Sequence, residues 1–144
     1  FLDRLTKIYV IQLDKNNLGS DIFNSAYLNI VLIWNKGIAF GLFSFSESNL
    51  YNILSLIISI IVAILVIMAL KSHSFKRYSL LMIVGGALGN LHDRIFFNAV
   101  PDFIDFHIRS FHWFIFNVAD IFITVGVISM IILEIKNNSK QKYE

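Results

Sequence analysis

Residues 50–70, LYNILSLIISIIVAILVIMAL, contain no charged side chain. A helix of this length, at about 1.5 Å per residue, spans the roughly 30 Å hydrocarbon core of a bilayer. The rest of the chain has the same character: 56% of its 144 residues are hydrophobic and 15% are charged, with a mean hydropathy of +0.68. We therefore expect a polytopic membrane protein.

Two further stretches are apolar enough to cross the membrane. One covers residues 78–93 if its polar end reaches the interface or a polar cavity, and the other covers residues 113–133 with the single charge Asp120 near its start. The net charge of +2 and the absence of a dense basic stripe argue against nucleic-acid binding. No cysteine is present, so thiol nucleophiles and thiolate metal sites are excluded.

The distribution of basic residues predicts the orientation. Residues 71–77 hold three Lys or Arg, and the tail after residue 134 holds three more of the total of 12. By the positive-inside rule both segments face the cytoplasm. Residues 1–49 and the loop 93–112 then lie outside, on the extracytoplasmic side.

The segment before residue 50 is not helical in pattern. Residues 27–34 are rich in β-branched and aromatic side chains and are followed by Asn35-Lys36-Gly37, which favours a turn. We expect a small strand or hairpin there. Residues 38–45 are apolar enough for the interface, and their pattern fits a second strand and a short surface helix equally well.

Two acids fall at matching depth in the predicted helices. Asp93 ends the second complete span and Asp120 begins the third, so antiparallel packing would bring both carboxylates together near the outer interface. Ionisable groups in a membrane segment cost about 2.5–3.5 kcal/mol and generally have a partner or a task. The alternative is that each marks a helix end or pairs with Arg94 or Arg109.

Two close carboxylates share one proton near neutral pH, because like charges resist joint ionisation. The ionised member can take a proton from water while the protonated member donates one, as in aspartic proteases. Asn90 and Asn117 each precede one of these acids by three residues. Each asparagine is interpreted either as a site residue or as a helix-capping residue. Asp102 and Asp105 are interpreted as solvated or loop-ordering residues, with Asp102 able to brace the site.

No metal site is expected, because His92, His107 and His112 lack the His-x-x-x-His spacing of a zinc-binding helix. Trp113, Phe114 and Phe116 are typical of an interfacial aromatic belt. The rival functions are a small transporter or proton-conducting subunit and a purely structural membrane subunit. The first would need acids at several depths, yet residues 50–70 contain none.

Five ordered segments resemble those of the bacterial lipoprotein signal peptidases, or signal peptidase II. They are Asp3-Arg4-Leu5-Thr6-Lys7, Asn35-Lys36-Gly37-Ile38-Ala39-Phe40, Gly85 to Arg94, Val100 to Phe106 and Phe116-Asn117-Val118-Ala119-Asp120. The resemblance implies an all-α membrane protein with a four-helix transmembrane bundle and a small extracytoplasmic β-element. The chain would form a single membrane-embedded peptidase domain over residues 1–144. Its parts would be the end of a largely missing first helix (1–10), a β-cradle (11–49) and the helices 50–70, 78–93 and 113–133.

The implied activity is aspartic endopeptidase cleavage of prolipoproteins just before a diacylglyceryl-modified cysteine, without a cofactor. The partners would be lipidated prolipoproteins and membrane lipids, and the protein would act as a monomer in the bacterial inner membrane. By the resemblance, Asp93 and Asp120 match the catalytic dyad, and four residues line the site: Asn35, Asn90, Arg94 and Asn117. Asp3 and Lys7 match the box at the outer end of the first helix. Three positions depart from the family pattern: Phe114, Ile115 and Ile121.

Overall fold

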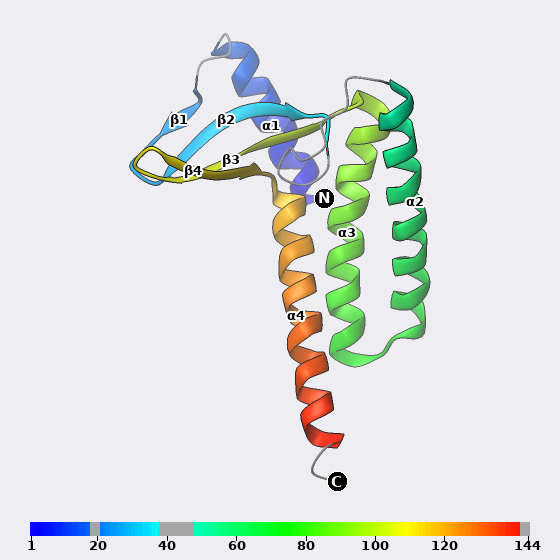
Figure 1. The fold of residues 1–144 in the computed structure, drawn as a ribbon. Helices are drawn as coiled ribbons and strands as arrows, with labels where there is room; N and C mark the ends of the chain where they lie inside the picture. Colours follow the sequence, from blue (N-terminus) through cyan, green and yellow to red (C-terminus); the bar gives the residue numbers. More distant parts are fainter. Residues whose placement is uncertain (18–20, 38–47, 142–144) are drawn as a thin grey trace.

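The computed structural model describes residues 1–17, 21–37 and 48–141. Three of its helices are long and apolar enough to cross a membrane: α2 (Ser48–Lys71), α3 (Ser74–Phe97) and α4 (Val118–Gln141). Helix α3 packs against both α2 and α4 (Figure 1). Many of the large side chains on α2 and α4 face outward, as expected for helices whose solvent is lipid.

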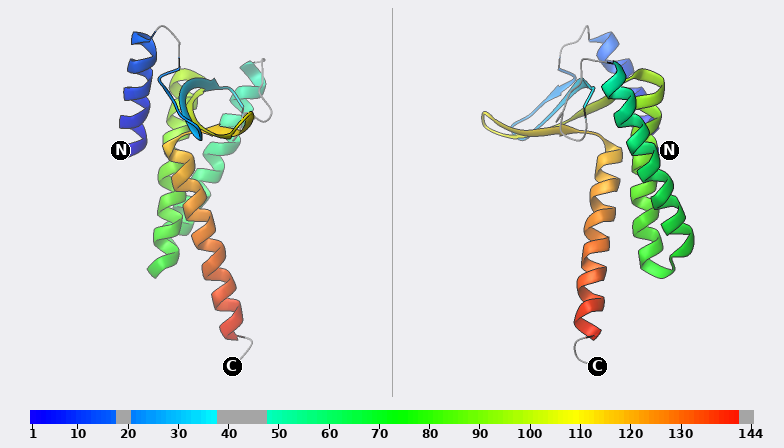
Figure 2. Two further views of the ribbon diagram at one scale, coloured as in Figure 1. Left: turned by 90° about the vertical axis from the view of Figure 1, so that its left-hand side faces the viewer. Right: turned by 45° about the vertical axis from the view of Figure 1, so that its right-hand side comes forward.

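A four-stranded antiparallel sheet lies across one end of these helices. Its strands, in spatial as well as chain order, are β1 (Phe23–Asn24), β2 (Leu28–Asn35), β3 (Val100–Ile108) and β4 (Phe111–Phe116). The remaining helix, α1 (Leu2–Asn16), lies beside the sheet and contacts β2, β3, α3 and α4 (Figure 2). Polar residues from α1, the sheet and two membrane helices therefore meet at this end.

The expected four-helix transmembrane bundle is confirmed in part: a mostly helical chain with three membrane-capable helices carries a small antiparallel sheet. The strand expected over residues 27–34 is present as β2. The segment 38–45, for which strand and surface helix were both predicted, lies outside the described residues.

The third spanning helix begins later than the expected residue 113, and this boundary is corrected. Residues 111–116 form β4, which pairs with β3, and α4 starts at Val118. Residues 100–108, interpreted as part of a polar loop, form β3 between β2 and β4. The reversal between the two strands is made by Arg109, whose φ of 55° is left-handed.

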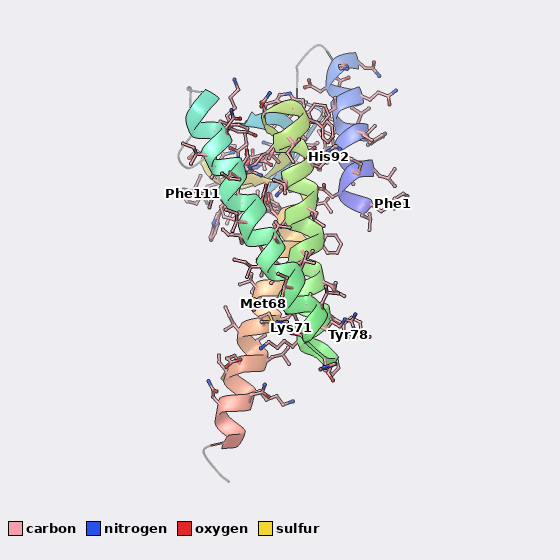
Figure 3. The ribbon with its side chains drawn as sticks, turned by 90° about the vertical axis from the view of Figure 1, so that its right-hand side faces the viewer. Phe1, Met68, Lys71, Tyr78, His92 and Phe111 are labelled. Atoms are coloured by element: carbon pink, nitrogen blue, oxygen red, sulfur yellow. The ribbon has the colours of Figure 1, made fainter. Side chains whose placement is uncertain are left out.

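The second span also differs in its bounds, because α3 continues past Asp93 to Phe97 and ends at Asn98 with a left-handed φ of 53°. Asp93 thus lies one turn inside the helix. The connection between α2 and α3, which carries Lys71, lies at the end away from the sheet, while His92 lies near the sheet (Figure 3). The basic connection and the sheet are therefore at opposite ends, as the charge distribution predicts.

Helices α3 and α4 pack closely against each other, and glycines permit this contact. A Cβ on Gly86 would overlap the carbonyl oxygen of Ala119 and lie 2.8 Å from Ile123 Cγ1. A Cβ on Gly126 would lie 2.6 Å from Ile83 Cγ1. Small residues of this kind let membrane helices approach closely.

We expect Gly86→Ala to destabilise the folded protein by about 1–3 kcal/mol, because the added methyl group meets backbone and a packed side chain. Gly85→Ala is the matched control, since nothing lies within 4 Å of its Cβ position; it should shift stability by no more than about 1 kcal/mol, toward greater stability. Thermal unfolding in detergent measures both. Equal effects of the two variants would contradict the assignment of Gly86 to a tight helix contact.

Candidate active site

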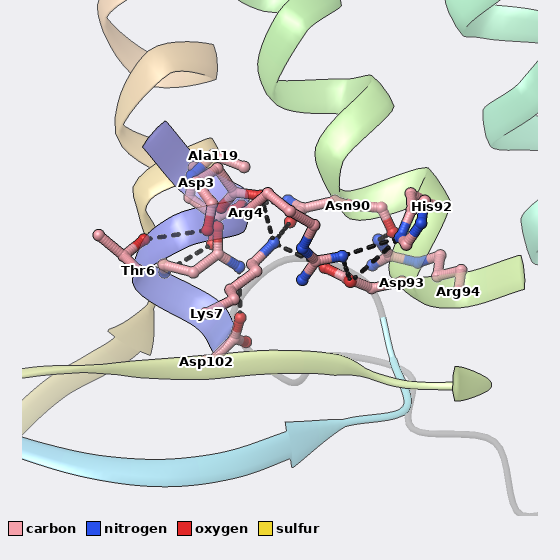
Figure 4. Close-up of polar contacts among 12 residues, drawn as sticks. Asp3, Arg4, Thr6, Lys7, Asn90, His92, Asp93, Arg94, Asp102 and Ala119 are labelled. Carbon is pink, nitrogen blue, oxygen red and sulfur yellow. Dashed lines mark hydrogen bonds and ion pairs between the residues drawn. The ribbon is translucent and has the colours of Figure 1, made fainter. Parts of the chain in front are cut away.

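The ammonium group of Lys7 is the most deeply buried cation at the sheet end. Its side chain is 0% exposed, and Nζ donates to Asn90 Oδ1 at 2.8 Å and to Asp93 Oδ2 at 2.7 Å. It also lies 2.9 Å from Asp3 Oδ2, one helical turn away on α1. Two hydrogen bonds and an ion pair thus surround the buried ammonium group. Figure 4 shows this group joining α1 to α3.

Asp93 is held by cations on both of its oxygens. Oδ1 accepts from Arg4 and Oδ2 accepts from Lys7, and the side chain is 0% exposed. Of these two cations Lys7 is buried, whereas the Arg4 side chain is 29% exposed. These contacts make Asp93 an ion-pair link between α1 and α3.

Asp120, in the first turn of α4, has amide partners in place of cations. Its Oδ1 accepts from Asn90 Nδ2 at 2.8 Å, and its Oδ2 accepts from the Asn117 backbone N–H at 3.2 Å. Asn117 Oδ1 in turn accepts from the Asp120 backbone N–H at 3.2 Å. This reciprocal pair is a helix-capping box, so Asn117 fixes the Asp120 carboxylate and begins the helix with the same bonds.

Asp102 on β3 lies on the other side of Asn117. Its Oδ1 accepts from Asn117 Nδ2 at 2.6 Å and its Oδ2 accepts from Asn35 Nδ2 at 2.9 Å, and the residue is only 3% exposed. Burial raises the pKa of Asp102 to about 6, against the lowering effect of its bonds to Asn35 and Asn117; the negative charge of Asp120 raises it further. Asn117 therefore bonds to two carboxylates of like charge, one on each side.

A polar cleft of about 220 Å³ collects most of the predicted site residues. Besides apolar positions it is lined by both Asp102 and Asp120 and by the four predicted site residues Asn35, Asn90, Arg94 and Asn117. Asp93 does not line it. The structure thus brings together five of the six residues that the sequence analysis assigned to the site, and adds Asp102.

Arg94 serves mainly to hold the wall of this cleft. Its guanidinium donates to the Gly37 carbonyl at 3.0 Å and to the Asn90 carbonyl at 3.2 Å. The Gly37 N–H donates in turn to Asn35 Oδ1 at 2.8 Å. Arg94 therefore positions the turn that carries Asn35 against α3.

Beside the polar cleft lies an apolar cavity of about 460 Å³, and Asp120 lines both. The cavity is lined by residues of β3, β4 and the first turns of α4. Among them are Phe114 and Ile121, two of the positions that depart from the family pattern. Its apolar walls are Phe106, Ile108, Phe111, Trp113, Phe114, Phe116, Ile121 and Val125. One carboxylate is thus exposed to a polar space on one side and to an apolar space on the other.

Sequence reasoning gave Asp102 at most a bracing role at the site, because the segment around it was interpreted as a polar loop. A signal was present: Asp102 is flanked by Val100, Pro101, Phe103 and Ile104, an apolar setting that a solvated loop does not require. The burial of residues 100–103 in β3 explains that setting.

Apolar helices closed at one end by a small sheet, with the carboxylates of Asp102 and Asp120 joined through Asn117 at that end, define a helical membrane protein with an acid-pair site. The chain belongs to the signal peptidase II family: the family model described as signal peptidase (SPase) II matches residues 1–136. Members of this family are peptidases of the aspartic class.

The curated relatives agree over nearly the whole chain. The lipoprotein signal peptidase of Pelagibacter ubique (strain HTCC1062) is 49% identical over 142 residues, covering 99% of this chain and 86% of the relative. The lipoprotein signal peptidase of Anaplasma phagocytophilum (strain HZ) is 45% identical, covering 96% of this chain and 88% of the relative. A bacterial membrane enzyme solved by the in meso method at 2.3 Å resolution is 30% identical, with a TM-score of 0.71 over 99% of this chain and 93% of that one.

We expect Lys7→Met to lower the free energy of unfolding by about 3 kcal/mol or more, because it leaves Asp3 and Asp93 buried without their shared cation. The exposed Lys15, at the end of the same helix, provides the control, and Lys15→Met should change stability by less than about 0.5 kcal/mol. Thermal unfolding in detergent measures the difference. Similar stability of both variants would show that the Lys7 ion pairs do not hold α1 in place.

Asp102 should impose a pH dependence on stability. Since its pKa is raised from 3.8 to about 6 on folding, the folded state binds the proton more tightly than the unfolded chain does. Its contribution is fully present below pH 3.8 and is lost as the pH rises to about 6. The fall in melting temperature between pH 4 and pH 6 should be smaller in Asp102→Asn than in the wild type; parallel curves would contradict this assignment.

Proposed function

We propose that the protein is a membrane aspartic endopeptidase that cleaves prolipoproteins immediately before the diacylglyceryl-modified cysteine, with Asp102 and Asp120 as its catalytic dyad. One observation carries this proposal: Asn117 bonds to both carboxylates, in a polar cleft that shares Asp120 with an apolar cavity. The names of the curated relatives, lipoprotein signal peptidases, support the substrate class.

The contacts favour Asp102 over Asp93 as the partner of Asp120. Asp93 was the sequence-based expectation, but its two oxygens are occupied by Arg4 and Lys7. Asp102 has neutral amide partners and a pKa raised to about 6, so it can hold or release a proton close to neutral pH. We therefore propose an anchoring role for Asp93 and a catalytic role for Asp102.

The proposed chemistry uses one proton shared by the two acids. The ionised carboxylate takes a proton from a water molecule as the water oxygen attacks the scissile carbonyl carbon. The protonated carboxyl group donates its proton to the carbonyl oxygen. Collapse of the tetrahedral intermediate breaks the C–N bond, and a proton passes to the leaving amine. The site residues Asn35, Asn90 and Asn117 keep the carboxylates oriented through this cycle.

The apolar cavity supports recognition of the lipid on the substrate. A peptide lying across the polar cleft could place the acyl chains of its modified cysteine against the aromatic walls formed by β3, β4 and α4. Phe114 and Ile121 would then set the width of that space. Membrane lipids would surround the rest of the helices.

We further propose that residues 1–144 act as one membrane-embedded domain and as a monomer, with α1 containing the end of the first helix of a four-helix bundle. Three apolar helices and the family fit a protein of the bacterial inner membrane. The active site would lie on the extracytoplasmic side, because the basic connection 71–77 lies at the opposite end from the sheet.

The test is cleavage of a diacylglyceryl-modified prolipoprotein in detergent or lipid, beside the unmodified precursor. We expect only the modified precursor to be cut, and we expect Asp102→Asn and Asp120→Asn each to reduce the rate by at least about 1,000-fold while remaining folded. Asp93→Asn should lower stability, yet its folded fraction should keep cleaving.

Three results would count against this proposal. Wild-type levels of cleavage by folded Asp102→Asn protein would remove Asp102 from the dyad, and loss of cleavage in folded Asp93→Asn protein alone would restore Asp93. Equal cleavage of both precursors would contradict the lipid requirement. Melting temperatures of all three variants separate loss of chemistry from loss of fold.

A further inference from the structure

Three potential metal ligands meet on the sheet, outside the cleft that holds the carboxylate pair. Asp105 and His107 lie on β3 and His112 lies on β4, directly across from His107 in the antiparallel register. The two imidazole rings stack with centroids 5.0 Å apart. One ligand atom from each of the three residues lies within 4.8 Å of the others.

Two buried atoms of this cluster have no protein partner. Asp105 is 3% exposed and its Oδ1 makes no hydrogen bond, and the buried Nδ1 of His107 makes none either. The other carboxylate oxygen of Asp105 lies 2.8 Å from His112 Nδ1. Buried polar atoms in folded proteins are nearly always satisfied, so unmade bonds on two neighbouring ligand groups point to a missing partner.

Local strand geometry explains why the cluster forms. Residues two apart on a strand project from the same face, so Asp105 and His107 point to one side of β3. A register irregularity between Asp105 and His107 brings His112 within reach of both. The sequence argument against a metal was the absence of His-x-x-x-His spacing, which is a criterion for helices. It does not apply here, because these ligands come from paired strands.

We propose that Asp105, His107 and His112 bind a divalent transition-metal ion, of which Zn²⁺ is the best fit. Two imidazoles and one carboxylate suit zinc, whereas Mg²⁺ and Ca²⁺ prefer oxygen ligands alone. Zinc–ligand bonds of about 2.0–2.2 Å place neighbouring ligand atoms about 3.3 Å apart. Rotation of His112, whose side chain is 54% exposed, can close the cluster to that spacing.

The ion would link β3 to β4 at the edge of the apolar cavity, since His107 also lines that cavity. Its exposed side leaves a position for water, as the half-exposed His112 indicates. The inference does not depend on the proposed peptidase chemistry, because none of the three residues bonds to Asp102 or Asp120 in the part of the chain that the structure describes.

The experiment is calorimetric titration of Zn²⁺ into untagged, chelator-treated protein in detergent, with Mg²⁺ as the comparison ion. We expect one Zn²⁺ per chain and no saturable Mg²⁺ binding. His112→Asn and His107→Gln should each weaken Zn²⁺ binding at least tenfold. His73→Asn, which removes an exposed histidine at the start of α3, is the matched control and should bind as the wild type does.

Hydrogen exchange gives a second readout that does not rely on activity. Zn²⁺ should slow exchange of the β3 and β4 amides in the wild type and in His73→Asn, and should leave His112→Asn unchanged. Because His112 is exposed, its substitution is not expected to unfold the protein. Absence of Zn²⁺ binding, or binding unaltered in both His107→Gln and His112→Asn, would overturn the proposal.

Discussion

The arrangement of the sheet end depends on one buried cation. Removing the Lys7 ammonium from water is costly, and the cost is offset because it donates to Asn90 and Asp93 and forms an ion pair with Asp3 at the same time. Lys7 takes the oxygen of the Asn90 amide, so the amide nitrogen is turned toward Asp120. A charge on α1 thereby determines the orientation of a carboxylate on α4 that it does not bond to.

The helices and the carboxylate on α4 could be predicted from sequence because their signals are local. Hydropathy located three spans, and the Asn-x-x-Asp spacing identified Asn117 with Asp120. The choice between Asp93 and Asp102 could not be made in this way. Asp93 lies in α3 and Asp102 in the strand that follows it, and their partners come from distant parts of the chain. Arg4 and Lys7 contact Asp93, whereas Asn35 and Asn117 contact Asp102. Strand β3 was missed because its segment was interpreted as a polar loop, and β4 was missed because its aromatic residues also fit a membrane-interface belt.

Two environments meet at Asp120. On one side, asparagine amides and the Arg94 guanidinium line the polar cleft. On the other side, aromatic and aliphatic side chains line the apolar cavity. The position of Asp120 between these two spaces depends on backbone contacts as well as on side chains. The close contact of α3 with α4 at Gly86 fixes the depth at which α4 begins. This arrangement agrees with the family relationship. A peptidase whose relatives are lipoprotein signal peptidases requires polar catalytic groups beside a surface that is compatible with lipid.

The capping box at Asn117 has a consequence for how the protein can change over evolutionary time. In most helices the residue that begins the helix can be exchanged for another capping residue without loss of function. Here the side-chain amide of Asn117 both caps α4 and donates to the Asp102 carboxylate, while the backbone N–H of the same residue donates to Asp120. Ser or Asp at this position would still cap the helix, but neither carries the amide that donates to Asp102. Selection for folding alone would therefore tolerate several residues at position 117, whereas selection for the acid pair would tolerate very few.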